Sequence, residues 1–158
     1  MNAFKWAVLG LIARLAIGGV LIVAGASKLS SPPEEFAVVI ESYELVSPDA
    51  AQSLAALMPW GELVLGFALV FGFWTPAASI AAGAMFVTFI GAILSTKARG
   101  IELPNCGCFG GSFHPRPTVT MLMDVGLLLA AYAAFFHGSR LWSLDNWAEG
   151  RYTPRRTP

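Results

Sequence analysis

The sequence has little charge for its size and very few cysteines. Charged residues make up 13% of the 158 residues and hydrophobic residues 56%, whereas soluble domains carry about 25% charged residues. A soluble globule with so few charged side chains would lack a polar surface, so lipid must contact much of this protein. Ten basic residues balance ten acidic ones. The sequence has no basic run, which argues against a nucleic-acid partner.

The motifs of several common enzyme classes are also missing. The sequence contains no Gly-x-Ser-x-Gly nucleophile turn, no phosphate-binding loop, no His-Glu-x-x-His zinc motif and no dinucleotide-binding glycine pattern. Any chemistry must therefore come from residues outside these motifs.

Four long apolar segments are present instead, over residues 6–26, 54–72, 77–94 and 119–136. A helix of about 20 apolar residues crosses the hydrocarbon core of a bilayer. We therefore predict an all-α membrane protein. A bundle of four transmembrane helices forms one domain over residues 1–140, and a short cytoplasmic tail follows over residues 141–158. The first segment resembles a signal peptide because Lys5 precedes it, but Arg14 interrupts the apolar run, so we expect a retained helix.

The loops predict the orientation in the membrane. Four spans place both termini on one side, together with the turn at residues 73–76. Five Lys or Arg residues outside the spans lie on this side, against four on the other. The positive-inside rule then puts the termini in the cytoplasm and both long loops outside the cell inner (plasma) membrane.

The first of these loops predicts a short helix. Ser31 and Glu34 have the spacing of a capping box. Apolar residues then recur at helical spacing, namely Phe36, Val39, Ile40, Tyr43 and Val46. We expect a short amphipathic helix at the membrane interface, over the mouth of the bundle.

Four ionisable residues lie within the spans or at their ends: Arg14, Lys28, Glu62 and Asp124. Such residues normally face the bundle interior, since exposure to lipid costs roughly 2.5–3.5 kcal/mol. Counting from the segment ends puts Arg14 and Glu62 at similar depth, which predicts an Arg14–Glu62 ion pair. Asp124 falls within reach of Lys28. Either these charges only set the helix register, or the four residues bind a quinone and carry protons.

The two cysteines form a Cys106-Gly107-Cys108 pair in the loop before the last span, which reads IELPNCGCFGGSFHPRP over residues 101–117. A disulfide across one residue needs strained geometry that glycine permits, and strained, exposed disulfides exchange readily. Outside the cytoplasm we therefore expect a redox-active pair. One alternative is copper or zinc handling by Cys106, Cys108 and His114. Another is a purely structural disulfide.

The segment Asn105–Gly110 before a last span resembles the MauE/DoxX family of redox-associated membrane proteins. Further similar positions are Arg14 with Gly18, the stretch Ala24–Leu29, and Glu62 with Gly66, so the resemblance covers about residues 10–135. It implies a four-helix bundle that supports thiol chemistry outside the cytoplasm, as in the maturation of the disulfide-rich methylamine dehydrogenase. The cysteine pair favours the MauE side of the family over the DoxX side.

Together these features predict a membrane-embedded thiol–disulfide redox protein. Cys106 and Cys108 are the candidate catalytic residues, and a quinone is the candidate cofactor. The expected partner is an extracytoplasmic thiol protein or an oxidoreductase subunit, because one cysteine pair cannot form a relay alone. Two alternatives stay open: a non-catalytic membrane subunit or anchor of an oxidoreductase complex, and a Cys/His metal-handling protein.

Overall fold

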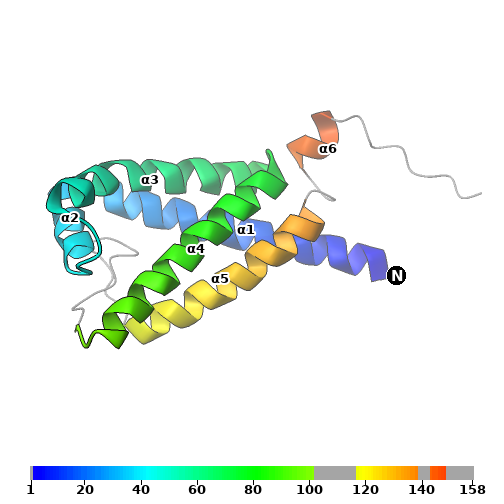
Figure 1. Ribbon diagram of the computed structural model, residues 1–158. Coiled ribbons are helices and arrows are strands. Elements are labelled where there is room, and N and C mark those ends of the chain that lie inside the picture. Colours follow the sequence, from blue (N-terminus) through cyan, green and yellow to red (C-terminus); the bar gives the residue numbers. More distant parts are fainter. Residues whose placement is uncertain (1, 102–116, 139–142, 149–158) are drawn as a thin grey trace, which may run out of the picture.

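The computed structural model describes residues 2–101, 117–138 and 143–148, and within these ranges the chain forms six helices and no strand. The helices are α1 (Asn2–Leu29), α2 (Pro33–Glu41), α3 (Pro48–Phe71), α4 (Thr75–Ala98), α5 (Pro117–His137) and α6 (Leu144–Ala148) (Figure 1). Four of them, α1, α3, α4 and α5, are long and apolar enough to cross a membrane. The prediction of an all-α bundle with four spans and a short helix after the first is confirmed.

The long helices run antiparallel to their neighbours in sequence (Figure 1). Helix α1 packs against both α3 and α5, and α4 packs against α5. We call the end where α2 lies the α2 end and the opposite end, which holds the start of α1, the α6 end. The core between them is built from small and branched side chains of all four helices, among them Ile17, Leu69, Ala82 and Ala131.

Glycines let α1 and α3 approach closely. A Cβ atom on Gly18 would lie 2.8 Å from the Gly66 carbonyl oxygen, and one on Gly66 would lie 2.9 Å from the Gly18 carbonyl oxygen. Nearer the α2 end, a Cβ on Gly25 would lie 2.8 Å from the carbonyl oxygen of Pro59. Small residues at such contacts allow close packing of helix backbones in membranes. These contacts therefore set the register between the two helices.

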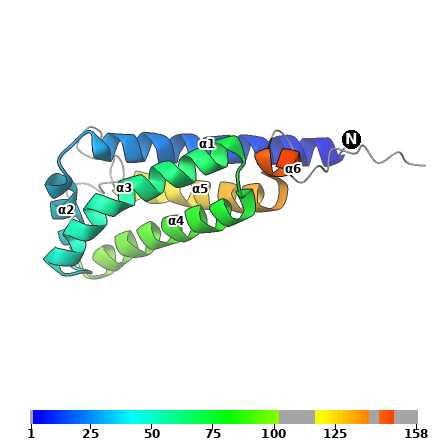
Figure 2. The ribbon, with the colours of Figure 1, turned by 90° about the horizontal axis from the view of Figure 1, so that it is seen from above.

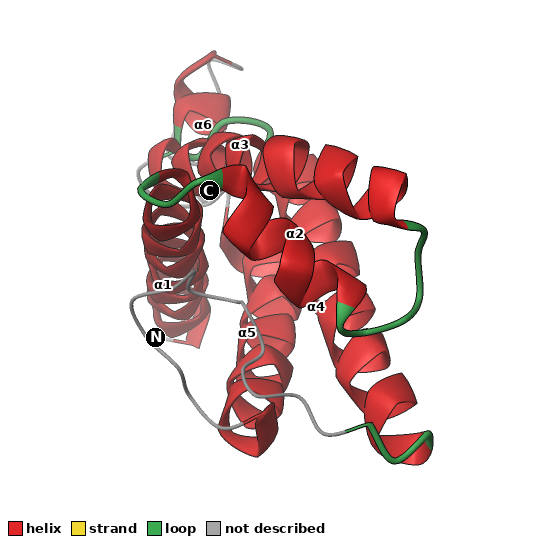
Figure 3. Ribbon diagram, turned by 90° about the vertical axis from the view of Figure 1, so that its left-hand side faces the viewer, coloured by secondary structure: helices red, strands yellow, loops and turns green. Residues whose placement is uncertain are grey.

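Helix α2 lies across the end of the bundle (Figure 3). Its Phe36 and Ala37 are buried and form a small cluster with Ala55 of α3, which confirms the expected position over the mouth. The predicted capping box does not form, because Pro32 occupies the N-cap and no side chain caps the helix. Ser31 lies one residue too early, and the two prolines start the helix in its place.

An arginine at the end of α4 connects that helix to the α2–α3 turn. Arg99 donates hydrogen bonds to the backbone carbonyl oxygens of Tyr43 and Glu44. Glu44 has a left-handed φ of 52°, which only a few per cent of non-glycine residues adopt. These hydrogen bonds connect the α2–α3 turn to Arg99, which lies two residues before Ile101 at the start of the cysteine loop.

At the opposite end, α6 lies beside the short turn between α3 and α4 (Figure 2). The Asp145 carboxylate accepts hydrogen bonds from the backbone N–H groups of Trp74 and Thr75, at 2.7 and 2.8 Å. The Ser143 hydroxyl donates to the Gly72 carbonyl oxygen at 2.7 Å. Asp145 therefore caps α4 from a distant part of the chain, within the segment predicted as a tail.

Candidate functional site

A buried ion pair joins α1 to α3 at the α2 end. The Lys28 ammonium group donates hydrogen bonds to both carboxylate oxygens of Glu62, at 2.6 and 2.8 Å. The two side chains are only 0% and 2% exposed. The close contact of Gly25 with α3 brings the last turn of α1 beside Glu62. Because the pair is buried, loss of either partner removes a charge that compensates the other one.

The predicted Arg14–Glu62 pair is wrong. Arg14 and Lys28 are fourteen residues apart on α1, which corresponds to about 21 Å of helix rise. Arg14 donates instead to the Gly138 carbonyl oxygen at 2.8 Å. The prediction assumed a helix height of about 30 Å, whereas α1 has 28 residues and is about 42 Å long. The contact of Gly25 with α3 therefore brings Lys28 rather than Arg14 beside Glu62.

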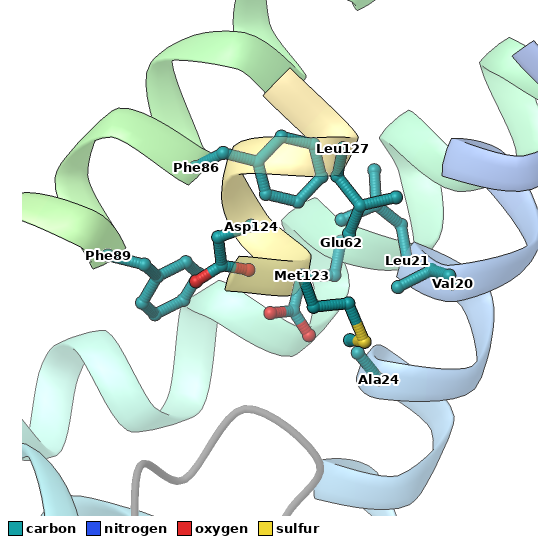
Figure 4. A pocket seen from close by; sticks show the side chains of 9 residues that line it. All are labelled: Val20, Leu21, Ala24, Glu62, Phe86, Phe89, Met123, Asp124 and Leu127. Carbon is teal, nitrogen blue, oxygen red and sulfur yellow. The ribbon is translucent and has the colours of Figure 1, made fainter. Parts of the chain in front are cut away.

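Asp124 of α5 lines the same small cavity as Glu62 (Figure 4). The cavity has a volume of about 20 Å³, enough for one water molecule. Its other walls are apolar and come from α1, α4 and α5: Val20, Leu21, Ala24, Phe86, Phe89, Met123 and Leu127. Three of the four predicted ionisable residues, Lys28, Glu62 and Asp124, thus gather at one end of the bundle.

Two aromatic rings flank the Lys28 ammonium group. Its nitrogen lies 5.2 Å from the centre of the Phe36 ring and 6.0 Å from the centre of the Phe89 ring, distances at which a cation is attracted to an aromatic face. Phe36 was predicted only as part of the apolar side of its helix. No charge or motif marks Phe89, which lies within an uncharged span, so sequence reasoning missed its place at the charge centre.

Arg14 forms a separate polar cluster at the α6 end. The residue is 1% exposed and contacts the end of α5 through the Gly138 carbonyl oxygen. Carbonyl groups at a helix C-terminus carry partial negative charge and favour a cation. The Asp145 carboxylate also attracts the guanidinium electrostatically. At Gly72 a side chain would collide with the Arg14 guanidinium, so a glycine is needed beside it.

Within the described part of the chain, the four ionisable residues do not line one common pocket. Arg14 lies at the other end from Lys28, Glu62 and Asp124. The cavity between Glu62 and Asp124 is water-sized, whereas pockets for small organic ligands usually measure about 300–1,000 Å³. A groove of about 310 Å³ lies between α4 and α5, next to Ser79 and Tyr132, but none of the four residues lines it.

The candidate residues Cys106, Cys108 and His114 lie outside the described residues. Among the residues that are described, no group of three or more His, Cys, Asp or Glu side chains could hold a metal ion. The centre that the structure does define is therefore the one formed by Lys28, Glu62 and Asp124, with Phe36 and Phe89 beside it.

Comparison with known proteins gives one family. The family profile described as "Methylamine utilisation protein MauE" matches residues 6–137. The Methylamine utilization protein MauE of Methylophilus methylotrophus is 34% identical over 98 residues, which are 62% of this chain and 51% of the relative. The protein of the same name from Paracoccus denitrificans is 28% identical over 120 residues, or 76% and 63% of the two chains. The chain thus spans between half and two thirds of these relatives' length. No solved structure matches it.

Proposed function

Since the chain belongs to the MauE family of methylamine utilisation membrane proteins, we propose that it is a membrane-embedded thiol–disulfide redox protein. Cys106 and Cys108 exchange a disulfide with an extracytoplasmic thiol protein and so support that partner's oxidation and maturation. The protein spans the plasma membrane with its termini in the cytoplasm and the α2 end outside, as the loop charges predict.

The position of the loop ends is the observation that supports this proposal best. Helix α4 finishes and α5 begins at the α2 end (Figure 1). Cys106 is five residues beyond Ile101, and an extended chain of that length reaches about 18 Å at most. This chain length supports our proposal that the cysteine pair works near the end of the bundle that carries α2 and the Lys28–Glu62 pair.

The proposed exchange needs two steps. A thiolate of the partner attacks one sulfur of the Cys106–Cys108 disulfide, forms a mixed disulfide and releases the other cysteine as a thiolate. The partner's second thiolate then attacks the partner's other sulfur atom, the one bonded to this chain in the mixed disulfide. Two electrons pass from the partner to the pair, which ends as two thiols after taking up two protons, and the partner ends with a disulfide.

Trapping of the mixed disulfide tests this function. The full chain with Cys106→Ser or Cys108→Ser, expressed in its host, should form a covalent adduct with a partner that reducing agent releases. An impermeant thiol reagent on intact cells should label the wild type only after reduction. Because the chain has only two cysteines, the reagent reports on this pair alone.

Three results would contradict the proposal. The first is unchanged partner maturation with the double Cys→Ser chain, which would make the protein an anchor. The second is copper or zinc that is purified with the wild type and lost with either single variant, which would make it a metal-handling protein. The third is labelling only after the cells are opened, which would place the pair inside.

A further inference from the structure

Helix α6 is fixed to the turn between α3 and α4 by hydrogen bonds with backbone groups. The Asp145 carboxylate accepts from the N–H groups of Trp74 and Thr75, at 2.7 and 2.8 Å. The Gly72 carbonyl oxygen accepts from the Ser143 hydroxyl and from the Asp145 N–H group, at 2.7 and 3.1 Å. The helix therefore holds a defined position against the turn (Figure 2), although it belongs to the segment predicted as a cytoplasmic tail.

The turn lies where two spans end. Helices α3 and α4 have 24 residues each, which corresponds to about 36 Å of helix rise, and the hydrocarbon core of a bilayer is about 30 Å thick. Both helices therefore reach the boundary of the hydrocarbon core at the turn that joins them. Since α6 is hydrogen-bonded to this turn, it lies at the height of the lipid headgroups.

Large apolar side chains are exposed on both elements. In the turn, Phe73 and Trp74 are 56% and 71% exposed, and their rings stack with 5.9 Å between the ring centres. On α6, Leu144 is 46% and Trp147 82% exposed. Residues three apart share one face of a helix, so Leu144 and Trp147 lie together, whereas Asp145 contacts the turn. Helix α6 thus has a polar side on the bundle and an apolar side that faces outward.

The lipid interface suits this apolar side better than water does. Leaving large apolar rings in water is unfavourable, whereas Trp is enriched in the headgroup region, which accommodates its amphipathic ring. Helices with one polar and one apolar side lie in the plane of this interface. The bilayer is next to this surface in every molecule, because α3 and α4 cross it, so no additional protein partner is required.

We propose that α6 and the α3–α4 turn form a membrane-docking surface that places the rings of Phe73, Trp74 and Trp147 in the headgroup region of the adjacent leaflet. The ligand is the lipid interface itself. The polar contacts of Asp145 and Ser143 hold α6 in the orientation that exposes its apolar side to the lipid. The surface includes neither cysteine, so the proposal goes beyond the thiol exchange and is independent of it.

Fluorescence quenching of single tryptophan residues in lipid bilayers tests this position. The chain has five tryptophans, and replacement of four of them by Phe leaves Trp147, Trp74 or Trp60 as the one emitter. Trp60 lies near the middle of α3 and is 59% exposed, so it is a matched control that contacts lipid near the bilayer centre. The full chain is reconstituted with lipids that carry bromine either in the upper part of the acyl chain or near its end.

Trp147 and Trp74 should both be quenched most strongly by bromine close to the headgroup, and Trp60 by bromine near the chain end. Iodide in the aqueous phase should quench Trp147 several-fold less than free tryptophan. If iodide quenches Trp147 as strongly as free tryptophan and neither bromolipid has an effect, α6 lies in water and the proposal is wrong. Protection of Trp147 from iodide and from both bromolipids would show a protein contact and would also overturn it.

One conservative substitution gives the same answer if a chain with a single tryptophan does not fold. Trp147→Phe changes only an exposed side chain, so it should leave the bundle intact. The fluorescence that the wild type has in excess of this variant comes from Trp147, and its quenching by the two bromolipids and by iodide can be compared directly. A difference signal that responds to iodide alone would contradict the docking surface.

Discussion

Arg14 and Lys28 are two buried cations on one helix, and they are stabilised in different ways. Both are almost completely buried, at 1% and 3% exposure, so each carries the cost of removing a charge from water. Arg14 contacts the backbone carbonyl oxygen at the end of α5. Lys28 contacts the carboxylate of Glu62 beside a cavity with a second carboxyl group.

This difference indicates which end of the bundle contains groups that can change their protonation state. A backbone carbonyl group cannot take up a proton, and arginine stays charged in proteins, so the Arg14 contact joins helices without changing its state. A carboxylate can gain or lose a proton, so the Lys28 centre can exist in more than one charge state. We therefore assign a structural role to Arg14 and a candidate functional role to Lys28, Glu62 and Asp124.

The largest expected effect comes from breaking the pair at the α2 end. Lys28→Met and Glu62→Gln should each lower the free energy of unfolding by about 3–5 kcal/mol, because each removes one partner of a buried ion pair. Denaturation in mixed micelles, followed by circular dichroism, measures these losses.

The double variant Lys28→Met/Glu62→Gln is the control for this pair. It removes both charges, so its loss should be clearly smaller than the sum of the two single losses. Additive losses would mean that the two side chains do not interact and would remove the contrast with Arg14.

A smaller effect should follow from disturbing the register on which both centres depend. Gly18→Val introduces a side chain against the Gly66 carbonyl oxygen and the Val70 side chain, and overpacking of this kind costs about 1–3 kcal/mol. The neighbouring Gly19 has no atom within 4 Å of its Cβ position, so Gly19→Val is a matched control that should be neutral. Equal stability of the two variants in the same micelle assay would contradict the glycine contact as the cause of the register.

The smallest effect is expected at the α6 end. Asp145→Ala removes the cap of α4 and the acidic neighbour of Arg14, and loss of a helix cap costs about 1 kcal/mol. Asp49→Ala, at an exposed position in the first turn of α3, should change stability by less than about 0.5 kcal/mol. Partner trapping by the cysteine variants should be unaffected by Asp145→Ala. A loss of trapping would show that the two ends of the bundle are coupled.

The helices could be predicted from the sequence because hydrophobicity over about 20 residues is a local property. Three of the four predicted segments lie within α1, α4 and α5, and the fourth, residues 54–72, extends one residue past the end of α3 at Phe71. The position of α2 followed from the spacing of Phe36 and its apolar neighbours, which marks one side of the helix for burial. The predicted cap at Ser31 was one residue too early, because Pro32 occupies the N-cap and α2 begins at Pro33.

The partners of the charges could not be predicted in the same way. Burying the charges of Arg14 and Glu62 costs free energy, so each charge needs a compensating group. This cost does not specify which group that is. Depth counted from opposite segment ends depends on the full length of each helix, and α1 has 28 residues rather than the 21 of the segment used for the count. The spacing of Gly18 and Gly25 on α1 was the signal that would have indicated the correct register.

By itself the sequence determined a four-span membrane protein with a short helix over its mouth and one cysteine pair before the last span. These properties depend on composition and on spacing along the chain. Only the tertiary structure decided that Lys28 pairs with Glu62, that Asp124 shares their cavity, and that Arg14 is held by the end of α5. The physical reason is that contacts between helix backbones at glycines set the register, and a shift of a few residues moves a charge by several ångströms to a different partner.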